Sequence, residues 1–204
     1  MINRLPTFAI LAAVTWIMWV ANGSLLAKSE DLVAEGAKPV KLAGGFKFTE
    51  GPAVAPNGDV YFTDIPNNRV HKWDVAAKKV STFMENSGGA NGLFFSKEGD
   101  LFACQGESKR VTSFYLEDGG EKELLADQYD GRPFNKPNDL WVHPNNGVFF
   151  TDPNYGRKDL SQDGEHLYFI TPYRDQVLRV DKDLKRPNGV VGTPDGKTLY
   201  VADP

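Results

Sequence analysis

The sequence predicts an all-β fold of the β-propeller class, and two observations lead to that prediction. First, a side chain with an oxygen atom stands beside a small or turn-forming residue four times, at spacings of 41, 47 and 50 residues. Second, a hairpin and a strand rich in apolar residues follow each time. Repeats of roughly 40–50 residues made of short strands are typical of propeller blades. The four positions, called the anchor residues below, are Glu50, Asn91, Asn138 and Asn188.

Each anchor residue precedes a short apolar stretch, a turn that ends near a glycine, and then a second strand. Glycine suits the positive φ that tight hairpins require. The expected second strands are 60–63, 101–103, 148–151 and 199–201. Third and fourth strands are expected at 69–73 and 79–83, at 110–114 and 123–125, and at 166–170 and 176–180.

These strands account for roughly three and a half blades, which is an incomplete ring. Unpaired strand edges are unfavourable, so we interpret the chain as the front part of a longer propeller. In a closed ring, residues 39–42 could supply a strand to the last blade. The alternative is a small open β-meander that is stable alone.

A second polar position recurs 14 or 15 residues after each anchor residue, at the end of the second strand. The ends of two antiparallel strands in a hairpin lie side by side, so both polar positions are expected on one face of the propeller. The residues are Asp64, Gln105, Asp152 and Asp203.

Composition narrows the possible functions. The net charge is −4 without a basic cluster, which argues against nucleic acid as a partner. The chain contains neither a phosphate-binding glycine loop nor the Gly-x-Ser-x-Gly motif of serine hydrolases. Cys104 is the only cysteine, so no disulfide can form within the chain, and we expect it reduced and buried in a strand.

The first residues are typical of an export signal. Arg4 precedes an almost wholly apolar run at 7–21, and Ala21-Asn22-Gly23 offers small residues for cleavage. We therefore expect a signal peptide at 1–23, a linker at 24–37 and the partial propeller at 38–204. The mature protein would be periplasmic or secreted, without stable membrane association. An uncleaved membrane-attached segment and a buried N-terminal helix are the alternatives.

The anchor residues indicate a cation site. Equivalent positions in successive blades are related by rotation about one axis, so four side-chain oxygens could converge on one point. Oxygen ligands suit hard divalent cations. The alternative is that these side chains cap neighbouring backbone groups.

The motifs around these residues resemble those of the gluconolactonase family, which includes regucalcin and luciferin-regenerating enzyme. They are Phe48-Thr49-Glu50-Gly51-Pro52, Lys136-Pro137-Asn138-Asp139-Leu140, Thr151-Asp152-Pro153-Asn154-Tyr155-Gly156 and Arg186-Pro187-Asn188-Gly189-Val190. The resemblance runs from about residue 46 to 204. It implies a six-bladed propeller with one divalent metal in its channel and hydrolysis of sugar lactones.

The resemblance also implies roles for individual residues. The expected metal ligands are Glu50, Asn138 and Asn188, although Asn138 binds substrate instead in some members. Lys136 stands where some members have an arginine that contacts substrate. The family's acidic metal ligand and general base lies in a later blade, so the catalytic base is expected beyond Pro204. The expected substrate-binding residues are Asn91, Gln105, Lys136, Asp152 and Tyr155.

The functional hypothesis is therefore hydrolysis of a small-molecule lactone, with water activated by a divalent cation. Ca²⁺ is the expected cation, and Mg²⁺, Mn²⁺ and Zn²⁺ are the alternatives. Two other functions remain open. The chain could be a non-catalytic binding module that a metal stabilises, or an inactive fragment of a larger enzyme.

Overall fold

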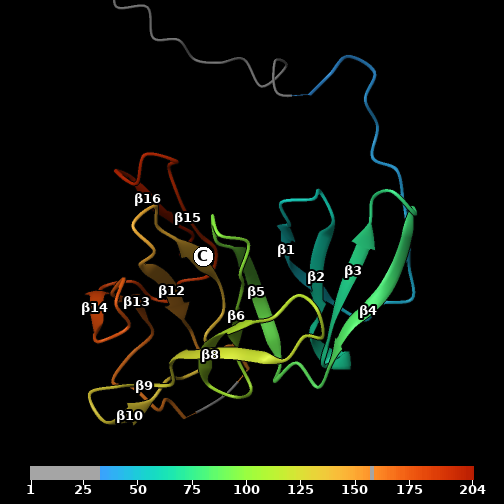
Figure 1. Ribbon diagram of the computed structural model, residues 1–204. Coiled ribbons are helices and arrows are strands. Elements are labelled where there is room, and N and C mark those ends of the chain that lie inside the picture. Colours follow the sequence, from blue (N-terminus) through green and yellow to red (C-terminus); the bar gives the residue numbers. More distant parts are fainter. Residues whose placement is uncertain (1–32, 157–158) are drawn as a thin grey trace, which may run out of the picture. The chain divides into compact units, whose positions relative to one another are not determined.

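Antiparallel sheets of consecutive strands make up almost all regular structure in the computed structural model (Figure 1). The structure describes residues 33–156 and 159–204, so the predicted signal peptide and residues 24–32 of the predicted linker lie outside the described residues. Residues 43–204 form one compact unit. Within it, three four-stranded sheets follow chain order, as propeller blades do, and two two-stranded sheets complete the described strands.

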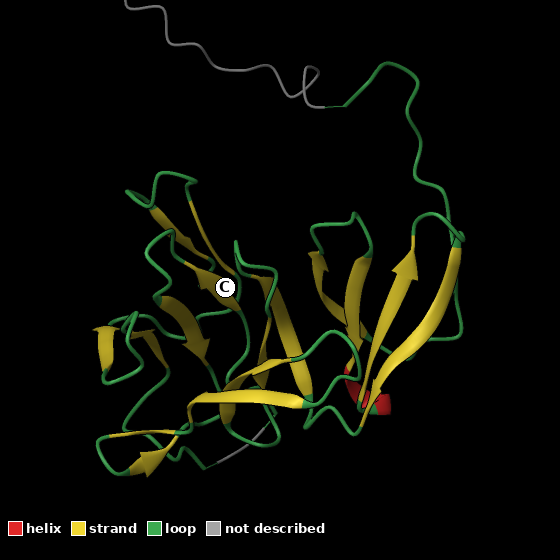
Figure 2. Cartoon of the chain, in the orientation of Figure 1, coloured by secondary structure: helices red, strands yellow, loops and turns green. Residues whose placement is uncertain are grey.

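The strands lie where the sequence repeat predicts blades, and Figure 2 shows them in yellow. The first blade comprises β1 (Thr49–Val54), β2 (Val60–Asp64), β3 (Arg69–Asp74) and β4 (Lys79–Glu85). The second comprises β5 (Ala90–Phe95), β6 (Leu101–Gln105), β7 (Arg110–Phe114) and β8 (Glu121–Ala126). The third comprises β11 (Leu140–Val142), β12 (Val148–Asp152), β13 (His166–Ile170) and β14 (Val177–Asp181). The fourth sheet pairs β15 (Val190–Gly192) with β16 (Leu199–Val201).

The structure differs from the predicted elements in three places. Glu50 and Asn91 lie inside β1 and β5, each beside a register shift, whereas the sequence places them before the strand. A short hairpin of β9 (Gln128–Tyr129) and β10 (Arg132–Pro133) was not predicted. Residues 39–42, which were expected to supply a strand only in a closed ring, form no strand in the structure and are exposed.

Apolar side chains hold neighbouring sheets together. One cluster, which includes Tyr61 and Leu101, fills the space between the first and second blades. A second cluster, which includes Phe102, Phe134 and Phe150, packs the second blade against the third. A smaller cluster of Trp141, Leu167 and Val190 joins the third blade to β15. Burial of this surface is the main stabilising contribution.

Cys104 is fully buried in β6 and forms no disulfide, as expected from the sequence. In the described part of the chain, no helix has the length and apolar character needed to cross a membrane.

The first strands of successive blades adjoin one another: β1 contacts β5, β5 contacts β11, and β11 contacts β15. These are the strands that carry or follow the anchor residues. The predicted all-β propeller architecture is confirmed, and it brings the four repeated positions to the same inner row of strands.

Candidate metal and substrate site

The four anchor residues line one cavity between the inner strands. This cavity, called the channel cavity below, has a volume of about 280 Å³. Glu50 comes from β1 and Asn91 from β5, while Asn138 and Asn188 each lie two positions before the first residue of β11 and β15. The convergence that the repeat predicts is therefore present in the structure.

The main-chain carbonyls of three anchor residues, Asn91, Asn138 and Asn188, connect successive blades. The Thr63 hydroxyl of β2 donates to Asn91 O at 3.0 Å and to Glu50 O at 3.1 Å. The Gly92 N–H donates to Asn138 O at 2.7 Å. The Thr151 hydroxyl of β12 donates to Asn188 O at 2.6 Å. The backbones of Asn91, Asn138 and Asn188 thus take part in inter-blade hydrogen bonds, that of Glu50 bonds within the first blade, and all four residues line the cavity.

Asp139 is a cavity residue that the sequence reasoning missed. It follows Asn138 at the position where the other anchor residues are followed by glycine, and that departure from the repeat was the available signal. Its Oδ2 accepts the Val190 N–H at 2.9 Å, which links the third blade to β15. Burial raises the pKa of the Asp139 carboxyl, and the negative charge of Glu50 acts in the same direction.

A second cavity, called the mouth below, has a volume of about 350 Å³. It shares Asn91, Asn138 and Asn188 with the channel cavity, so the two cavities meet at these three residues. Lys136 and Tyr155, both predicted to bind substrate, line the mouth. Lys136 Nζ lies 2.9 Å from Glu107 Oε1 in a partly exposed ion pair.

Tyr155 fixes the side-chain amide of Asn188. Asn188 Nδ2 donates to the Tyr155 hydroxyl at 2.9 Å. The Arg186 guanidinium lies over the Tyr155 ring, 5.4 Å from its centre, and Arg186 Nε lies 3.5 Å from Glu165 Oε2. Because Nδ2 is engaged by Tyr155, Oδ1 is the atom of Asn188 that is left to accept or to ligate.

The acidic residues at the ends of the second strands hold the chain that enters each blade. Asp64 Oδ1 accepts the N–H groups of Lys47 and Phe48, both at 3.1 Å. Asp152 accepts from Asn135 N at 2.8 Å and Lys136 N at 2.7 Å. Asp203 Oδ1 accepts from Lys185 N at 3.0 Å and Arg186 N at 2.6 Å. We call these three carboxylates the entry clamps.

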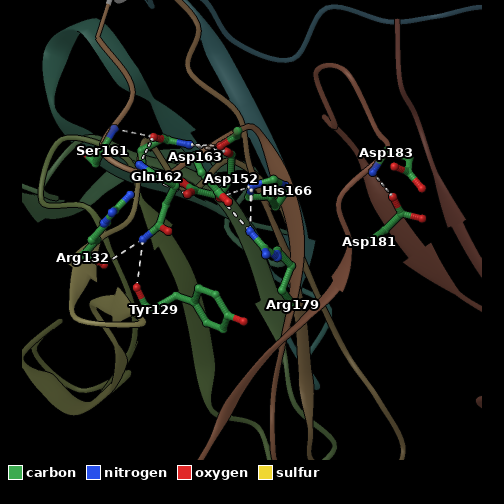
Figure 3. Close-up of polar contacts among 12 residues, drawn as sticks. Tyr129, Arg132, Asp152, Ser161, Gln162, Asp163, His166, Arg179, Asp181 and Asp183 are labelled. Atoms are coloured by element: carbon green, nitrogen blue, oxygen red, sulfur yellow. Dashed lines mark hydrogen bonds and ion pairs between the residues drawn. The ribbon is translucent and has the colours of Figure 1, made fainter.

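Asp152 lies within a wider polar cluster on the third blade (Figure 3). Gln162 of the same cluster donates to Arg132 O at 2.8 Å and Tyr129 O at 3.2 Å. Asp152 is fully buried, and burial raises the pKa of its carboxyl to about 7, although its backbone hydrogen bonds act in the opposite direction. The Asp152 carboxylate binds the backbone of the segment that carries Lys136, and Asp152 does not line the mouth.

Gln105 is also turned into its own blade. Its Nε2 donates to Ser87 O at 2.7 Å, and its Oε1 accepts from Arg110 Nε at 2.7 Å and the Thr112 hydroxyl at 3.1 Å. Neither Gln105 nor Asp152 is among the residues that line the mouth or the channel cavity. Their substrate-binding role stays a prediction, whereas their hydrogen bonds define a structural one.

The donor set fits a hard divalent cation. Glu50 offers a carboxylate, and Asn138 and Asn188 offer amide oxygens beside it in the channel cavity. Among the described residues, no group of three or more histidine, cysteine, aspartate or glutamate side chains is placed to hold a metal. The predicted set has one carboxylate and two amides, and its ligand role stays a prediction.

Comparison with known proteins agrees with this geometry. The sequence profile of the SMP-30/gluconolactonase/LRE-like region matches residues 48–204. A gluconolactonase from Zymomonas mobilis subsp. mobilis is 27% identical over 208 residues, which cover 89% of this chain and 58% of that protein. This chain therefore spans less than two thirds of the length of that relative.

Solved structures give the same picture. A gluconolactonase from Xanthomonas campestris superposes with a TM-score of 0.74 at 29% identity, covering 79% of this chain and 56% of the other. The calcium-binding protein regucalcin from Agrobacterium tumefaciens has a TM-score of 0.62 at 18% identity, covering 78% of this chain and 51% of the other. The latter similarity shows a common fold.

Proposed function

The chain belongs to the SMP-30/gluconolactonase/LRE-like family, and from this premise we propose that it is a metal-dependent lactone hydrolase. The observation that carries the proposal is the convergence of Glu50, Asn91, Asn138 and Asn188 on one cavity. A relative named gluconolactonase supports a sugar lactone as the substrate.

We assign cation binding to Glu50, Asn138 and Asn188 in this proposal. A divalent cation, when bound, supplies Lewis-acid activation of an ester carbonyl and of water. The Glu50 carboxylate gives the negative charge that such a cation requires. Ca²⁺ is the first candidate because the ligands are oxygens and a protein of the same fold is a calcium-binding protein.

The remaining residues of the site would bind and orient the substrate. Asn91 lies where the mouth meets the channel cavity, so its amide can donate to a lactone oxygen. Lys136 places a positive charge at the mouth. This charge attracts the carboxylate of the product and the partial negative charge on the ester carbonyl oxygen. Hydrolysis adds one water molecule across the acyl C–O bond and releases a hydroxycarboxylic acid. The proton acceptor is not assigned to a residue of this chain.

Acid release from glucono-δ-lactone, measured with a pH-stat, tests this proposal. We expect release above the uncatalysed rate, loss of that release with EDTA and recovery with Ca²⁺. Glu50→Gln keeps the size of the side chain but removes its charge, so kcat/KM should fall by about 100-fold or more. Partners that merely support metal ligands already contribute roughly 10–100-fold. Glu98→Gln, the same change in an exposed turn outside both cavities, should have no effect.

Three outcomes would contradict the proposal in different ways. Full activity in Glu50→Gln would remove Glu50 from the metal site. A Ca²⁺-dependent rise in thermal stability without hydrolysis of any lactone would favour the binding module. A protein that neither melts cooperatively nor hydrolyses a lactone would favour the inactive fragment.

A further inference from the structure

The walls of the mouth are mainly apolar. Two segments of the first blade and two of the third contribute them, while the asparagine side chains shared with the channel cavity form the polar part. The apolar side chains are Phe48, Ile65, Pro66, Pro137 and Tyr155. Apolar walls around a few convergent polar groups are typical of sites that bind the apolar part of a small molecule.

Phe48 is held in place although its ring is uncovered. Its N–H donates to the Asp64 entry clamp at 3.1 Å, and its carbonyl accepts from Ile65 N at 3.1 Å. The residue is nevertheless 57% exposed. A fixed backbone with an exposed aromatic ring gives the mouth an apolar surface that a ligand can cover without reordering the chain.

Among the described residues that line the mouth, those with hydrogen-bonding side chains are Asn91, Lys136, Asn138, Tyr155 and Asn188, and several of these groups are already engaged. Gln105, which was predicted to bind sugar hydroxyls, does not line the mouth: its amide nitrogen bonds to Ser87 in the segment before β5, and its oxygen accepts from Arg110 of β7. Lys136 Nζ is engaged by Glu107. A hydroxyl group that enters an apolar wall without a partner loses its hydrogen bonds to water, and this loss opposes binding.

We propose that the mouth selects lactones that carry an apolar substituent over polyhydroxylated lactones of the same ring size. The ring carbonyl would face the three shared asparagines, and the substituent would cover Phe48, Ile65 and Pro137. This inference rests on the proposed lactone hydrolysis and assigns its substrate class, which differs from the sugar lactone that the name of a relative suggests.

Three δ-lactones that differ only in their substituents test the proposal. They are δ-valerolactone, δ-decalactone with its pentyl chain, and glucono-δ-lactone with its hydroxyl groups. The full-length protein with Ca²⁺ should hydrolyse δ-decalactone with a kcat/KM at least about tenfold above that for the other two. A single methylene in an apolar pocket already changes specificity by roughly tenfold or more. An equal or higher kcat/KM for glucono-δ-lactone would overturn the proposal.

The variant Phe48→Ala tests whether the preference for the pentyl-substituted lactone arises at the mouth. The variant should lose about tenfold in kcat/KM on δ-decalactone, mainly through KM, and lose much less on δ-valerolactone. Tyr173→Ala removes an 88% exposed aromatic side chain outside the mouth and is the matched control. An equal loss on both lactones in Phe48→Ala would contradict a role in selecting the substituent.

Binding of lactams, which are not hydrolysed under these conditions, separates this inference from the proposed function. By calorimetry, the pentyl-substituted δ-lactam should bind at least about tenfold more tightly than unsubstituted δ-valerolactam, and Phe48→Ala should remove the difference. This binding preference without hydrolysis of any lactone would contradict the enzyme but support an apolar mouth. Hydrolysis without the preference would support the enzyme and overturn the inference.

Discussion

At the scale of single residues, the main-chain carbonyl, Nδ2 and Oδ1 of Asn188 have different roles. Its carbonyl accepts from the Thr151 hydroxyl and connects two blades. Its Nδ2 donates to the Tyr155 hydroxyl. In the described part of the chain, no hydrogen bond to Oδ1 is present. Tyr155 therefore determines which end of the amide faces away from it, and only the oxygen end can bind a cation.

Tyr155→Phe should weaken Ca²⁺ binding by about tenfold, because the amide of Asn188 would then rotate more freely. Titration calorimetry with Ca²⁺ measures this affinity directly and does not depend on catalysis. Tyr173→Phe removes a hydroxyl from an exposed tyrosine and should leave the affinity unchanged. If Tyr155→Phe binds Ca²⁺ with full affinity, Tyr155 does not position the ligand.

The sequence predicted the anchor residues correctly as a converging set but did not predict the role of the second repeated position. Both positions are polar, and both lie at one end of a blade, so repeat spacing alone cannot separate them. The difference lies in backbone partners. Asp64 and Asp152 each accept two main-chain N–H groups, and Gln105 donates to the Ser87 carbonyl in the segment before β5. Such contacts depend on tertiary packing that no local pattern encodes.

At the scale of elements, Gly51 and Gly92 allow the inner strands to approach each other. A Cβ atom on Gly51 would collide with the carbonyl oxygen of Asn91 in β5, and the glycine has a φ of 52°. A Cβ on Gly92 would meet Asn138 O at 2.8 Å. These glycines are therefore required by the contact between blades rather than by hairpin turns. That distinction agrees with their position, since the turns carry separate glycines.

The variants Gly51→Ala and Gly58→Ala distinguish the steric cost of the contact between inner strands from the cost of backbone strain. Both glycines have positive φ, 52° and 88°, but a Cβ on Gly58 would meet nothing within 4 Å. Gly58→Ala should reduce the free energy of unfolding by about 1–2 kcal/mol, the usual cost of a left-handed conformation. Gly51→Ala should cost about 1–3 kcal/mol more, because it also overpacks the inner strands. Urea unfolding measures both, and equal values would contradict the close contact.

Strand positions were well predicted because the periodic hairpins give a strong local signal. The predicted strands at 110–114 and 166–170 coincide with β7 and β13. The hairpin of β9 and β10 was missed because Gln128–Tyr129 and Arg132–Pro133 have no apolar alternation, and tertiary contacts such as Gln162 hold it in place. Residues 39–42 pair with no strand in the described part of the chain, and a strand requires a partner.

At the scale of the whole propeller unit, the inter-blade contacts form a series along the channel. Thr63 to Asn91, Gly92 to Asn138, and Thr151 to Asn188 join the first blade to the second, the second to the third, and the third to β15. The proposed cation ligands come from the first blade, the third blade and the segment before β15. A bound cation would therefore connect parts of the chain that are far apart in the sequence.

This arrangement predicts that Ca²⁺ stabilises the folded protein as a whole. A ligand that binds only the folded state raises the free energy of unfolding, by about 2.7 kcal/mol at a concentration 100 times its Kd. Thermal melts in EDTA and in excess Ca²⁺ should therefore differ by several degrees in Tm. Glu50→Gln should lose most of this shift, because the only carboxylate among the proposed ligands is gone, whereas Glu98→Gln should retain it. A full Ca²⁺ shift in Glu50→Gln would mean that the stabilising cation binds elsewhere, and that the converging anchor residues serve the blade contacts and the substrate instead.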